Sequence, residues 1–219
     1  MRINPALKEL VCEVTKQSFA DKLFAGTSGN LSVFDREENV MYITPTSYPY
    51  SRITPEDIVA IDPQGVIVEG IHNPSSEWRM HMEVYKAYPH VNAIVHTHSP
   101  YATSFGVNHC EVPVILIEMV AYLGGSIPLA DFALPGTVEV GTEAVKAMGE
   151  DKTCCILANH GALAVGADLW QAHTRAVYVE DAAHIYALSI ANGTKVYTVP
   201  DESIQAMKDR KKKRAKEAK

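Results

Sequence analysis

The chain has 219 residues, of which 47% are hydrophobic, and a formal net charge of −6 at pH 7. This length suits one domain with a single substantial core. The sequence has no run of about 18 apolar residues that would span a bilayer, and the segment MRINPALKEL lacks the apolar core of a secretion signal. These features argue against a membrane partner, and we expect a soluble, cytoplasmic protein.

Basic residues are concentrated at the C-terminus. Residues 208–219, KDRKKKRAKEAK, hold eight of the 20 basic and two of the 26 acidic residues, so this tail carries a charge of +6 and residues 1–207 carry −12. A basic block at a terminus is more often a solvated, frayed helix end than a ligand site. Because residues 1–207 contain no basic face or nucleic-acid motif, we expect one domain over 1–207, a frayed tail and no nucleic-acid partner.

The first half of the chain predicts a helix, two hairpins, a second helix and a strand. Asn4 as N-cap and Pro5 at the first helical position begin an amphipathic helix that extends to about Leu23. GNLSVF pairs with VMYIT, and DIVAID with GVIVEG, across turn-rich segments. The segment SSEWRMHMEVYKAY predicts a helix capped by Ser76, and NAIVHTH predicts the strand that follows it.

The second half predicts further strands and helices in alternation. Ser99 and Pro100 end the NAIVHTH strand and begin a helix, and VPVILI and SIPLA are candidate strands. A helix over about 137–148, the strand TCCILAN and a long helix over about 169–192 complete the pattern. The fold class expected from this pattern is therefore α/β, a single domain with a partly antiparallel sheet and helices packed on it.

Four cysteines are spread along the chain: Cys12, Cys110, Cys154 and Cys155. They form no CxxC pair, and the adjacent two lie in the apolar run CCILA, where a buried thiol behaves as a small hydrophobe. We expect them to be reduced and structural.

Three histidines follow apolar strands and form a candidate metal site. On a strand, residues i and i+2 face the same side, so His96 and His98 in IVHTHSPYA project together. His160 in ILANHGALAVG also follows an apolar run, and Gly161 permits a sharp turn and close backbone approach. Three histidines form a catalytic zinc set when the fourth position stays open. The other six histidines lack this setting, and His81 is more typical of a core or surface position.

A carboxylate and three hydroxyl-rich loops extend this candidate site. Glu77 stands at the start of a predicted helix, where it either complements the helix dipole or acts as a general acid/base. GTSGNLS, ITPTSYPY and NPSSEW each suit a turn, yet together they could bind an anion through backbone N–H groups, hydroxyls and an amide. Such neutral donors suit a phosphate monoester.

The ordered motifs GTSGNLS, ITPTSYPY, PSSEWRMH, IVHTHSPYA and NHGALAVG make the chain similar to the class II aldolase/adducin-like family, and most closely to its L-fuculose-phosphate aldolase branch. The resemblance covers about residues 5–195. It implies a single α/β domain with a largely antiparallel central sheet, in a cyclic homotetramer with active sites between subunits. It also implies zinc on His96, His98 and His160, with Glu77 as acid/base and as a ligand when no substrate is bound. It places the phosphate pocket on seven residues: Thr27, Gly29, Asn30, Thr46, Ser47, Ser75 and Ser76.

The chemistry implied is metal-dependent cleavage of a ketose 1-phosphate to dihydroxyacetone phosphate and an aldehyde. Zn²⁺ would stabilise the enediolate as a Lewis acid, Mn²⁺ and Co²⁺ being possible replacements, and Glu77 would shuttle the proton. The chain departs from the family where a tyrosine of the neighbouring subunit is expected to protonate the aldehyde oxygen. The segment LIEMVAYLGG places Glu118 there, with Tyr122 one helical turn later, and Glu118 could instead pair at a subunit interface.

That departure leaves alternatives open. An aldolase for 5-deoxypentulose or methylthioribulose 1-phosphates is one, and a sugar-phosphate 4-epimerase, which usually has Asp where Glu77 stands, is another. A non-enzymatic adducin-like binding module lacks a complete metal set, whereas this chain has all three histidines. A zinc hydrolase fits three histidines alone but does not account for the hydroxyl-rich loops.

Overall fold

The computed structural model describes residues 1–217, with side chains described as far as Arg214. Eight strands form one sheet in the order β4-β3-β2-β1-β5-β8-β7-β6. Neighbours are antiparallel except β6 and β7, which are parallel. The strands are β1 (Asn30–Asp35), β2 (Val40–Ile43), β3 (Val59–Ile61), β4 (Ile67–Glu69), β5 (Ala93–Thr97), β6 (Leu129–Ala130), β7 (Cys154–Leu157) and β8 (Gly161–Gly166). The predicted α/β class with a largely antiparallel sheet is confirmed.

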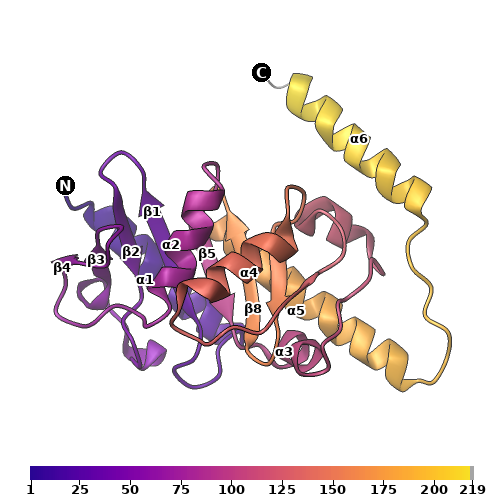
Figure 1. The fold of residues 1–219 in the computed structure, drawn as a ribbon, viewed down its shortest axis with the longest axis horizontal. Helices are drawn as coiled ribbons and strands as arrows, with labels where there is room; N and C mark the ends of the chain where they lie inside the picture. The colour runs from indigo at the N-terminus through magenta and orange to yellow at the C-terminus, as the bar shows by residue number, and fades with distance from the viewer. Residues whose placement is uncertain (218–219) are drawn as a thin grey trace.

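Helices cover both faces of this sheet (Figure 1). They are α1 (Pro5–Ala20), α2 (Trp78–Ala87), α3 (Pro100–Val107), α4 (Val138–Met148), α5 (Leu169–Ala191) and α6 (Asp201–Glu217), with short 3₁₀ turns η1 (Tyr50–Arg52) and η2 (Pro55–Asp57) and a π-helical turn η3 (Met119–Leu123). No helix among the described residues is both long and apolar enough to cross a membrane.

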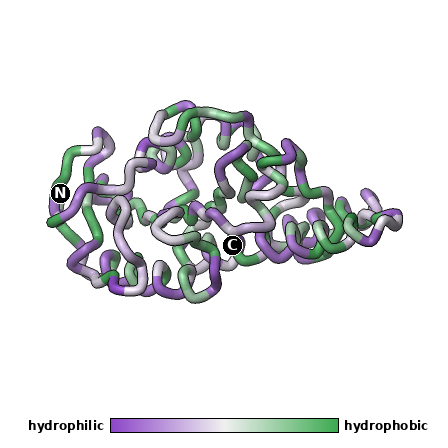
Figure 2. The backbone as a smooth tube through the Cα atoms, turned by 90° about the horizontal axis from the view of Figure 1, so that it is seen from below, coloured by the Kyte–Doolittle hydropathy of each residue, from purple (hydrophilic) through white to green (hydrophobic). Residues whose placement is uncertain are grey.

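Strand alternation divides the core into two layers. In β5, Val95 packs with α1, α3 and α5, whereas Ile94 packs with α2 and α4. The adjacent cysteines of β7 divide in the same way, Cys154 toward the first layer and Cys155 toward the second. Figure 2 shows hydrophobic and hydrophilic residues interleaved along the backbone, as expected of elements that each bury one side. The cysteines are free thiols, and only Cys110 is exposed among them.

Several boundaries differ from the predictions. The first helix ends at Ala20 rather than near Leu23, and its predicted N-cap is confirmed because Asn4 Oδ1 accepts a hydrogen bond from Ala6 N. The N-cap of α2 is Glu77, not Ser76, while Ser75 Oγ accepts from the Glu77 backbone N at 3.3 Å. Helix α2 therefore begins one residue later than the serines suggest.

One strand prediction was wrong, and one strand of the sheet was not predicted. VPVILI forms no strand in the described part of the chain, and only Val112 makes an isolated bridge, to Ile127. The backbone of this segment also contacts the chain before α6, because Val114 O accepts a hydrogen bond from Val199 N. Conversely, the six-residue β8 was not predicted, because its small residues Gly and Ala give little strand signal.

The basic tail lies within α6, the yellow helix that stands away from the sheet in Figure 1. The charge boundary at Lys208 falls inside this helix, so it does not coincide with a change of secondary structure. Lys211 Nζ donates to Ala121 O of η3 at 2.9 Å, and Lys208 Nζ lies 3.5 Å from an Asp151 carboxylate oxygen. Residues 218–219 of the predicted tail lie outside the described residues, and fraying of the tail stays a prediction.

Candidate active site

Four side chains from three parts of the fold meet at one end of β5 and β8. His96 belongs to β5, His98 follows it, His160 lies in the turn between β7 and β8, and Glu77 begins α2. One nitrogen or oxygen atom from each lies within 4.8 Å of every other, which makes this group a candidate metal site. The three histidines predicted from strand ends are therefore brought together with the predicted carboxylate.

Glu77 is the centre of this group. Its Oε2 lies 3.0 Å from His96 Nε2, and its Oε1 lies 3.1 Å from His160 Nε2. His96 Nε2 also lies 3.0 Å from His98 Nε2. Several nitrogen and oxygen ligand atoms thus face one point, an arrangement that a divalent cation satisfies better than protons can.

The local backbone explains why these imidazoles converge. His96 Nδ1 donates to Ala162 O at 3.0 Å, which leaves Nε2 directed at the site. Metal-binding histidines are commonly oriented by such a hydrogen bond from the nitrogen that does not bind the metal. A Cβ at Gly161 would lie 2.2 Å from Thr97 O, so only glycine lets β8 approach β5 here. The turn that carries His160 also uses Asn159 at a positive φ of 53°.

Two buried atoms of the group make no hydrogen bond of good geometry with the described residues: His160 Nδ1, and Glu77 Oε1, whose contact with His160 Nε2 at 3.1 Å is an ion pair only. Glu77 itself is only 8% exposed. A buried polar atom without a partner is costly, and a bound ion is one of the ways a site removes that cost. The donor set of three imidazoles and one carboxylate fits Zn²⁺ and related divalent ions.

The electrostatics of the group are strongly coupled. Burial favours the neutral form of Glu77, but charge on His96 and the contacts of His160 outweigh it and hold the pKa of Glu77 well below its usual range. Burial likewise opposes charge on His96, yet the Glu77 carboxylate raises the pKa of His96. Burial and the positive charges of the other two histidines lower the pKa of His98 to about 3. The group therefore favours one carboxylate balanced by one positive charge.

A cavity of about 360 Å³ opens onto this group. It is lined by all seven residues predicted for the phosphate pocket, Thr27, Gly29, Asn30, Thr46, Ser47, Ser75 and Ser76, together with Glu77, His98 and His160. The three hydroxyl-rich loops thus converge as expected. The described lining includes no lysine or arginine, so its polar surface is made of neutral donors and the site itself.

Backbone contacts hold these loops in place. Thr46 N donates to Asn73 O at 3.1 Å, and Ser75 N donates to Thr44 O at 3.0 Å. Gly29 has a φ of +85°, and a Cβ there would clash with the Phe24 ring at 2.5 Å. These interactions join the loops that carry the hydroxyls to β1 and β2, so the cavity is largely preformed.

The Asn30 amide contacts both the carboxylate of the site and a histidine of α2. Its Nδ2 donates to Glu77 Oε2 at 2.9 Å, and its Oδ1 lies against His81 Nε2. Asn30 therefore lines the cavity while its amide is engaged with Glu77. His81 was not predicted to belong here, although its position four residues after Glu77 places both on one face of α2.

Glu118 and Tyr122 do not line this cavity. In the single chain Glu118 is exposed at the start of η3. Tyr122 is 44% exposed, and its ring stacks on Tyr178 with centroids 4.4 Å apart. The structure does not bring either residue to the histidine cluster of its own chain.

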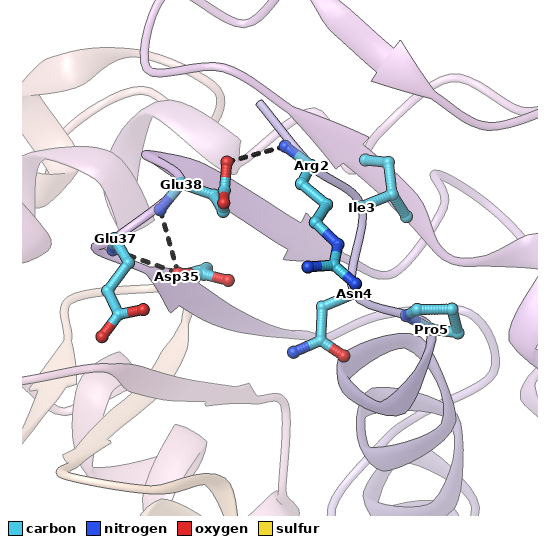
Figure 3. A pocket seen from close by; sticks show the side chains of 7 residues that line it. All are labelled: Arg2, Ile3, Asn4, Pro5, Asp35, Glu37 and Glu38. Atoms are coloured by element: carbon cyan, nitrogen blue, oxygen red, sulfur yellow. Dashed lines mark hydrogen bonds between the residues drawn. The ribbon is translucent and has the colours of Figure 1, made fainter.

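A second cavity, of about 320 Å³, lies between the N-terminal segment and the turn joining β1 and β2 (Figure 3). Two of its three acidic side chains have hydrogen-bond partners. Glu38 Oε2 accepts from Arg2 N at 2.7 Å, and Asp35 Oδ1 accepts from the backbone N of Glu37 and of Glu38, each at 3.1 Å. None of its lining residues belongs to the histidine site.

Comparison with known proteins agrees with this geometry. The family model described as "Class II Aldolase and Adducin N-terminal domain" matches residues 9–187. A 5-deoxy-D-ribulose 1-phosphate aldolase of Bacillus thuringiensis serovar kurstaki is 34% identical over 179 residues, covering 82% of this chain and 83% of the relative. An L-fuculose phosphate aldolase of Escherichia coli O6:H1 is 38% identical over 179 residues, covering 82% and 81%. The solved structure of an L-fuculose 1-phosphate aldolase superposes with a TM-score of 0.89 at 37% identity, covering 96% of this chain and 98% of that one.

Proposed function

The chain belongs to the class II aldolase and adducin family, and from that premise we propose that it is a metal-dependent aldolase acting on a ketose 1-phosphate. The products of cleavage are dihydroxyacetone phosphate and an aldehyde, and the reaction is reversible. The observation that carries this proposal is one cavity that joins three hydroxyl-rich loops to a carboxylate and three imidazoles.

The metal would be held by His96, His98 and His160, with Glu77 as a further ligand when no substrate is bound. Zinc is the ion we propose, because imidazole nitrogens and one carboxylate form its usual ligand set, while Mn²⁺ and Co²⁺ accept the same atoms. A divalent ion bound there supplies Lewis-acid stabilisation of the negative charge that C–C cleavage leaves on the three-carbon half of the substrate.

Glu77 is the residue we assign to proton transfer. Its carboxylate is buried beside the cavity, and Oε1 makes no hydrogen bond of good geometry, its neighbour at 3.1 Å being the proposed metal ligand His160. With His160 engaged by the metal, Oε1 would accept and return a proton at the substrate carbon. Asn30 holds the other oxygen, Oε2, at 2.9 Å, which orients the carboxylate. Covalent attachment of the substrate to a lysine is not needed in this scheme.

The phosphate of the substrate would bind at the hydroxyl-rich end of the cavity. Thr27, Thr46, Ser47 and Ser76 offer hydroxyl donors there, with Gly29 as a backbone approach. Ser75 is buried, and its hydroxyl accepts from the Glu77 backbone N, so its own proton is free to be donated to an anion. Neutral donors select a phosphate by geometry rather than by net charge.

The aldehyde half of the substrate would contact Glu118 or Tyr122 of a neighbouring subunit. We propose a cytoplasmic homotetramer with sites between subunits, as the family resemblance implies. Glu118, which precedes the π-helical turn η3, and Tyr122 within that turn are both exposed in the single chain, so a neighbouring subunit's site can reach them. Glu118→Gln tests this role, since glutamine retains a hydrogen-bond donor but cannot transfer a proton. Slower cleavage with an unchanged assembly is expected, whereas loss of assembly with normal activity in the remainder would assign Glu118 to the interface.

A second candidate substrate is a 5-deoxypentulose 1-phosphate, since the B. thuringiensis relative is named as an aldolase for such a sugar. The 4-epimerase alternative is less favoured, because the acid at the site is Glu77 rather than the expected aspartate. The adducin-like alternative is less favoured because all three histidines of a metal set lie together.

The deciding experiment is a cleavage panel. The purified protein, loaded with Zn²⁺, is given L-fuculose, 5-deoxyribulose and 5-methylthioribulose 1-phosphates, and release of dihydroxyacetone phosphate is measured. We expect release from at least one of them and loss of release after chelation. A pentulose 5-phosphate is supplied in a parallel reaction, and its epimerisation without release of dihydroxyacetone phosphate would instead identify an epimerase.

A further inference from the structure

A chain of buried hydrogen bonds runs from Glu77 into the core between β1 and α2. Asn30 Nδ2 donates to Glu77 Oε2 at 2.9 Å, and Asn30 Oδ1 faces His81 Nε2 at 2.5 Å. His81 Nδ1 lies 2.6 Å from Ser32 Oγ, which lies 2.7 Å from Tyr85 Oη. All five residues are buried, and Ser32 and His81 are fully so.

The direction of every hydrogen bond in this chain follows from the charge on Glu77. A carboxylate only accepts, so the Asn30 amide must present its NH₂ group to Glu77 and its carbonyl oxygen to His81. His81 must then carry its proton on Nε2, which leaves Nδ1 to accept from the Ser32 hydroxyl. Ser32 gives its one hydroxyl proton to His81, so Tyr85 donates to Ser32 Oγ, 2.7 Å away; Ser32 O, 3.0 Å from Tyr85 Oη, is a second acceptor of the same proton.

We propose that His81 is a positioning residue for the Glu77 carboxylate and acts by fixing the orientation of the Asn30 amide. Without a donor at His81, the amide could rotate by 180° about its Cβ–Cγ bond and place its oxygen against the carboxylate, where it repels. With that donor, the NH₂ group holds Oε2 and leaves Oε1 on the side of His160, 3.1 Å from its Nε2. This inference rests on the proposed function of Glu77 in proton transfer.

The surroundings of His81 suit a neutral imidazole of fixed tautomer. The side chain of His81 hydrogen-bonds to Asn30 and Ser32, which do not ionise. The ionisable groups that act on it are His96 and Glu77. Burial, followed by the charge of His96, lowers the pKa of His81 to about 3, so it stays neutral when Glu77 is ionised. A neutral histidine has one donor and one acceptor nitrogen, which is what the chain of hydrogen bonds requires.

The tautomer can be read directly by NMR of the full-length protein carrying ¹⁵N-labelled histidine. We expect the His81 signals, identified by their loss in His81→Leu, to show a protonated Nε2 and an unprotonated Nδ1, unchanged between pH 8 and pH 5. A protonated Nδ1, or titration within that range, would overturn the proposal. This readout does not depend on the substrate or on activity.

Kinetics supply the second test. His81→Leu is expected to lower kcat about 10-fold to 100-fold with KM changed less than about twofold, the effect of one hydrogen bond to a charged group. His81→Gln, which keeps a donor, should recover part of that loss. Val84→Ala is the matched control, because Val84 is a fully buried residue of the same helix outside the hydrogen-bond chain, and its loss should reduce stability but not kcat.

A double variant separates action through Glu77 from a general effect on the fold. In the Glu77→Gln background, His81→Leu should lower kcat by less than about twofold further, because an amide at position 77 can pair with either face of the Asn30 amide. A folded His81→Leu protein with wild-type kcat would refute the positioning role. If the wild-type protein cleaved no ketose 1-phosphate at all, the proposed function would fail instead, and the NMR result would stand by itself.

Discussion

Two of the clusters in this molecule that combine histidine, a carboxylate and a hydroxyl lie on opposite faces of the sheet. At the candidate active site, Glu77 and three histidines meet near Ser75, and two buried atoms have no hydrogen-bond partner. Between α1 and α5, His173 Nε2 lies 3.0 Å from Asp21 Oδ2, and His173 Nδ1 lies 2.9 Å from Ser18 Oγ.

The second cluster has the residue types of a serine hydrolase but not the accessibility. Ser18 is fully buried, and Asp21 Oδ1 is already occupied by the side chain of Gln17 at 2.9 Å. His173 donates to Asp21 and accepts from Ser18, so its two nitrogens are both used. Similar residues thus join two helices in one cluster and form a candidate ligand set beside a cavity in the other. Whether buried polar atoms have hydrogen-bond partners therefore identifies a site better than the residue types alone.

The largest expected effect comes from removing a histidine of the first cluster. His98→Ala should lose nearly all bound metal and lower cleavage on the order of 10³-fold, because the ion supplies several kcal/mol of transition-state stabilisation. Metal analysis and dihydroxyacetone phosphate release measure both. His173→Ala is the control and should keep full metal content; equal metal loss in the two variants would erase the distinction between the clusters.

The next largest effect is at Glu77. Glu77→Gln should lower kcat about 10²-fold to 10⁴-fold, since a proton shuttle is lost, while the fold and the binding of a phosphorylated enediolate mimic persist. Rate measurements and calorimetric titration with the mimic separate catalysis from binding. Cleavage at the wild-type rate would leave Glu77 only its role at the start of α2.

A smaller effect is expected at the phosphate end of the cavity. Ser76→Ala should raise KM about tenfold with little change in kcat, because it removes one hydrogen bond to a charged group that is held equally in ground and transition states. Ser104→Ala is the matched control, an exposed serine of α3 whose hydroxyl bonds Tyr101 O. If affinity instead depended on a lysine, the phosphate pocket would lie elsewhere.

The smallest effect concerns stability and pH, and it belongs to the second cluster. Burial lowers the pKa of His173 despite the opposing charge of Asp21. A histidine whose pKa is lowered in the folded protein binds its proton more readily in the unfolded chain. The free energy of unfolding therefore falls as the pH drops below the pKa of about 6.5 that histidine has in the unfolded chain, by at most about 1.4 kcal/mol per pH unit. His173→Asn should flatten this fall in urea titrations from pH 7 to pH 5 while cleavage at pH 7 stays normal; an unchanged slope would contradict the assignment.

Sequence patterns predicted the metal cluster because strand alternation and a glycine-backed turn are local rules. The pairing of His96 and His98 follows from one strand, and the hydroxyl-rich loops follow from turn chemistry. Convergence of His160 with them depends on β8 lying beside β5, a long-range pairing that no local pattern in GALAVG indicates. The hydrogen bond between His81 and Asn30 was not predicted, because it joins two elements that are far apart in the sequence. A polar residue four positions after Glu77 was the only local signal of that link.

The position of β5 between β1 and β8 has a consequence for the order of folding. The strands β1 to β4 can assemble from residues 30–69, but the histidine site needs β5 paired with β8, which begins 64 residues after β5 ends at Thr97. Closing so long a loop is slow compared with forming hairpins. Metal affinity should therefore appear late in refolding, after the N-terminal hairpins are protected from hydrogen exchange, and a nascent chain shorter than about 166 residues would have no complete site.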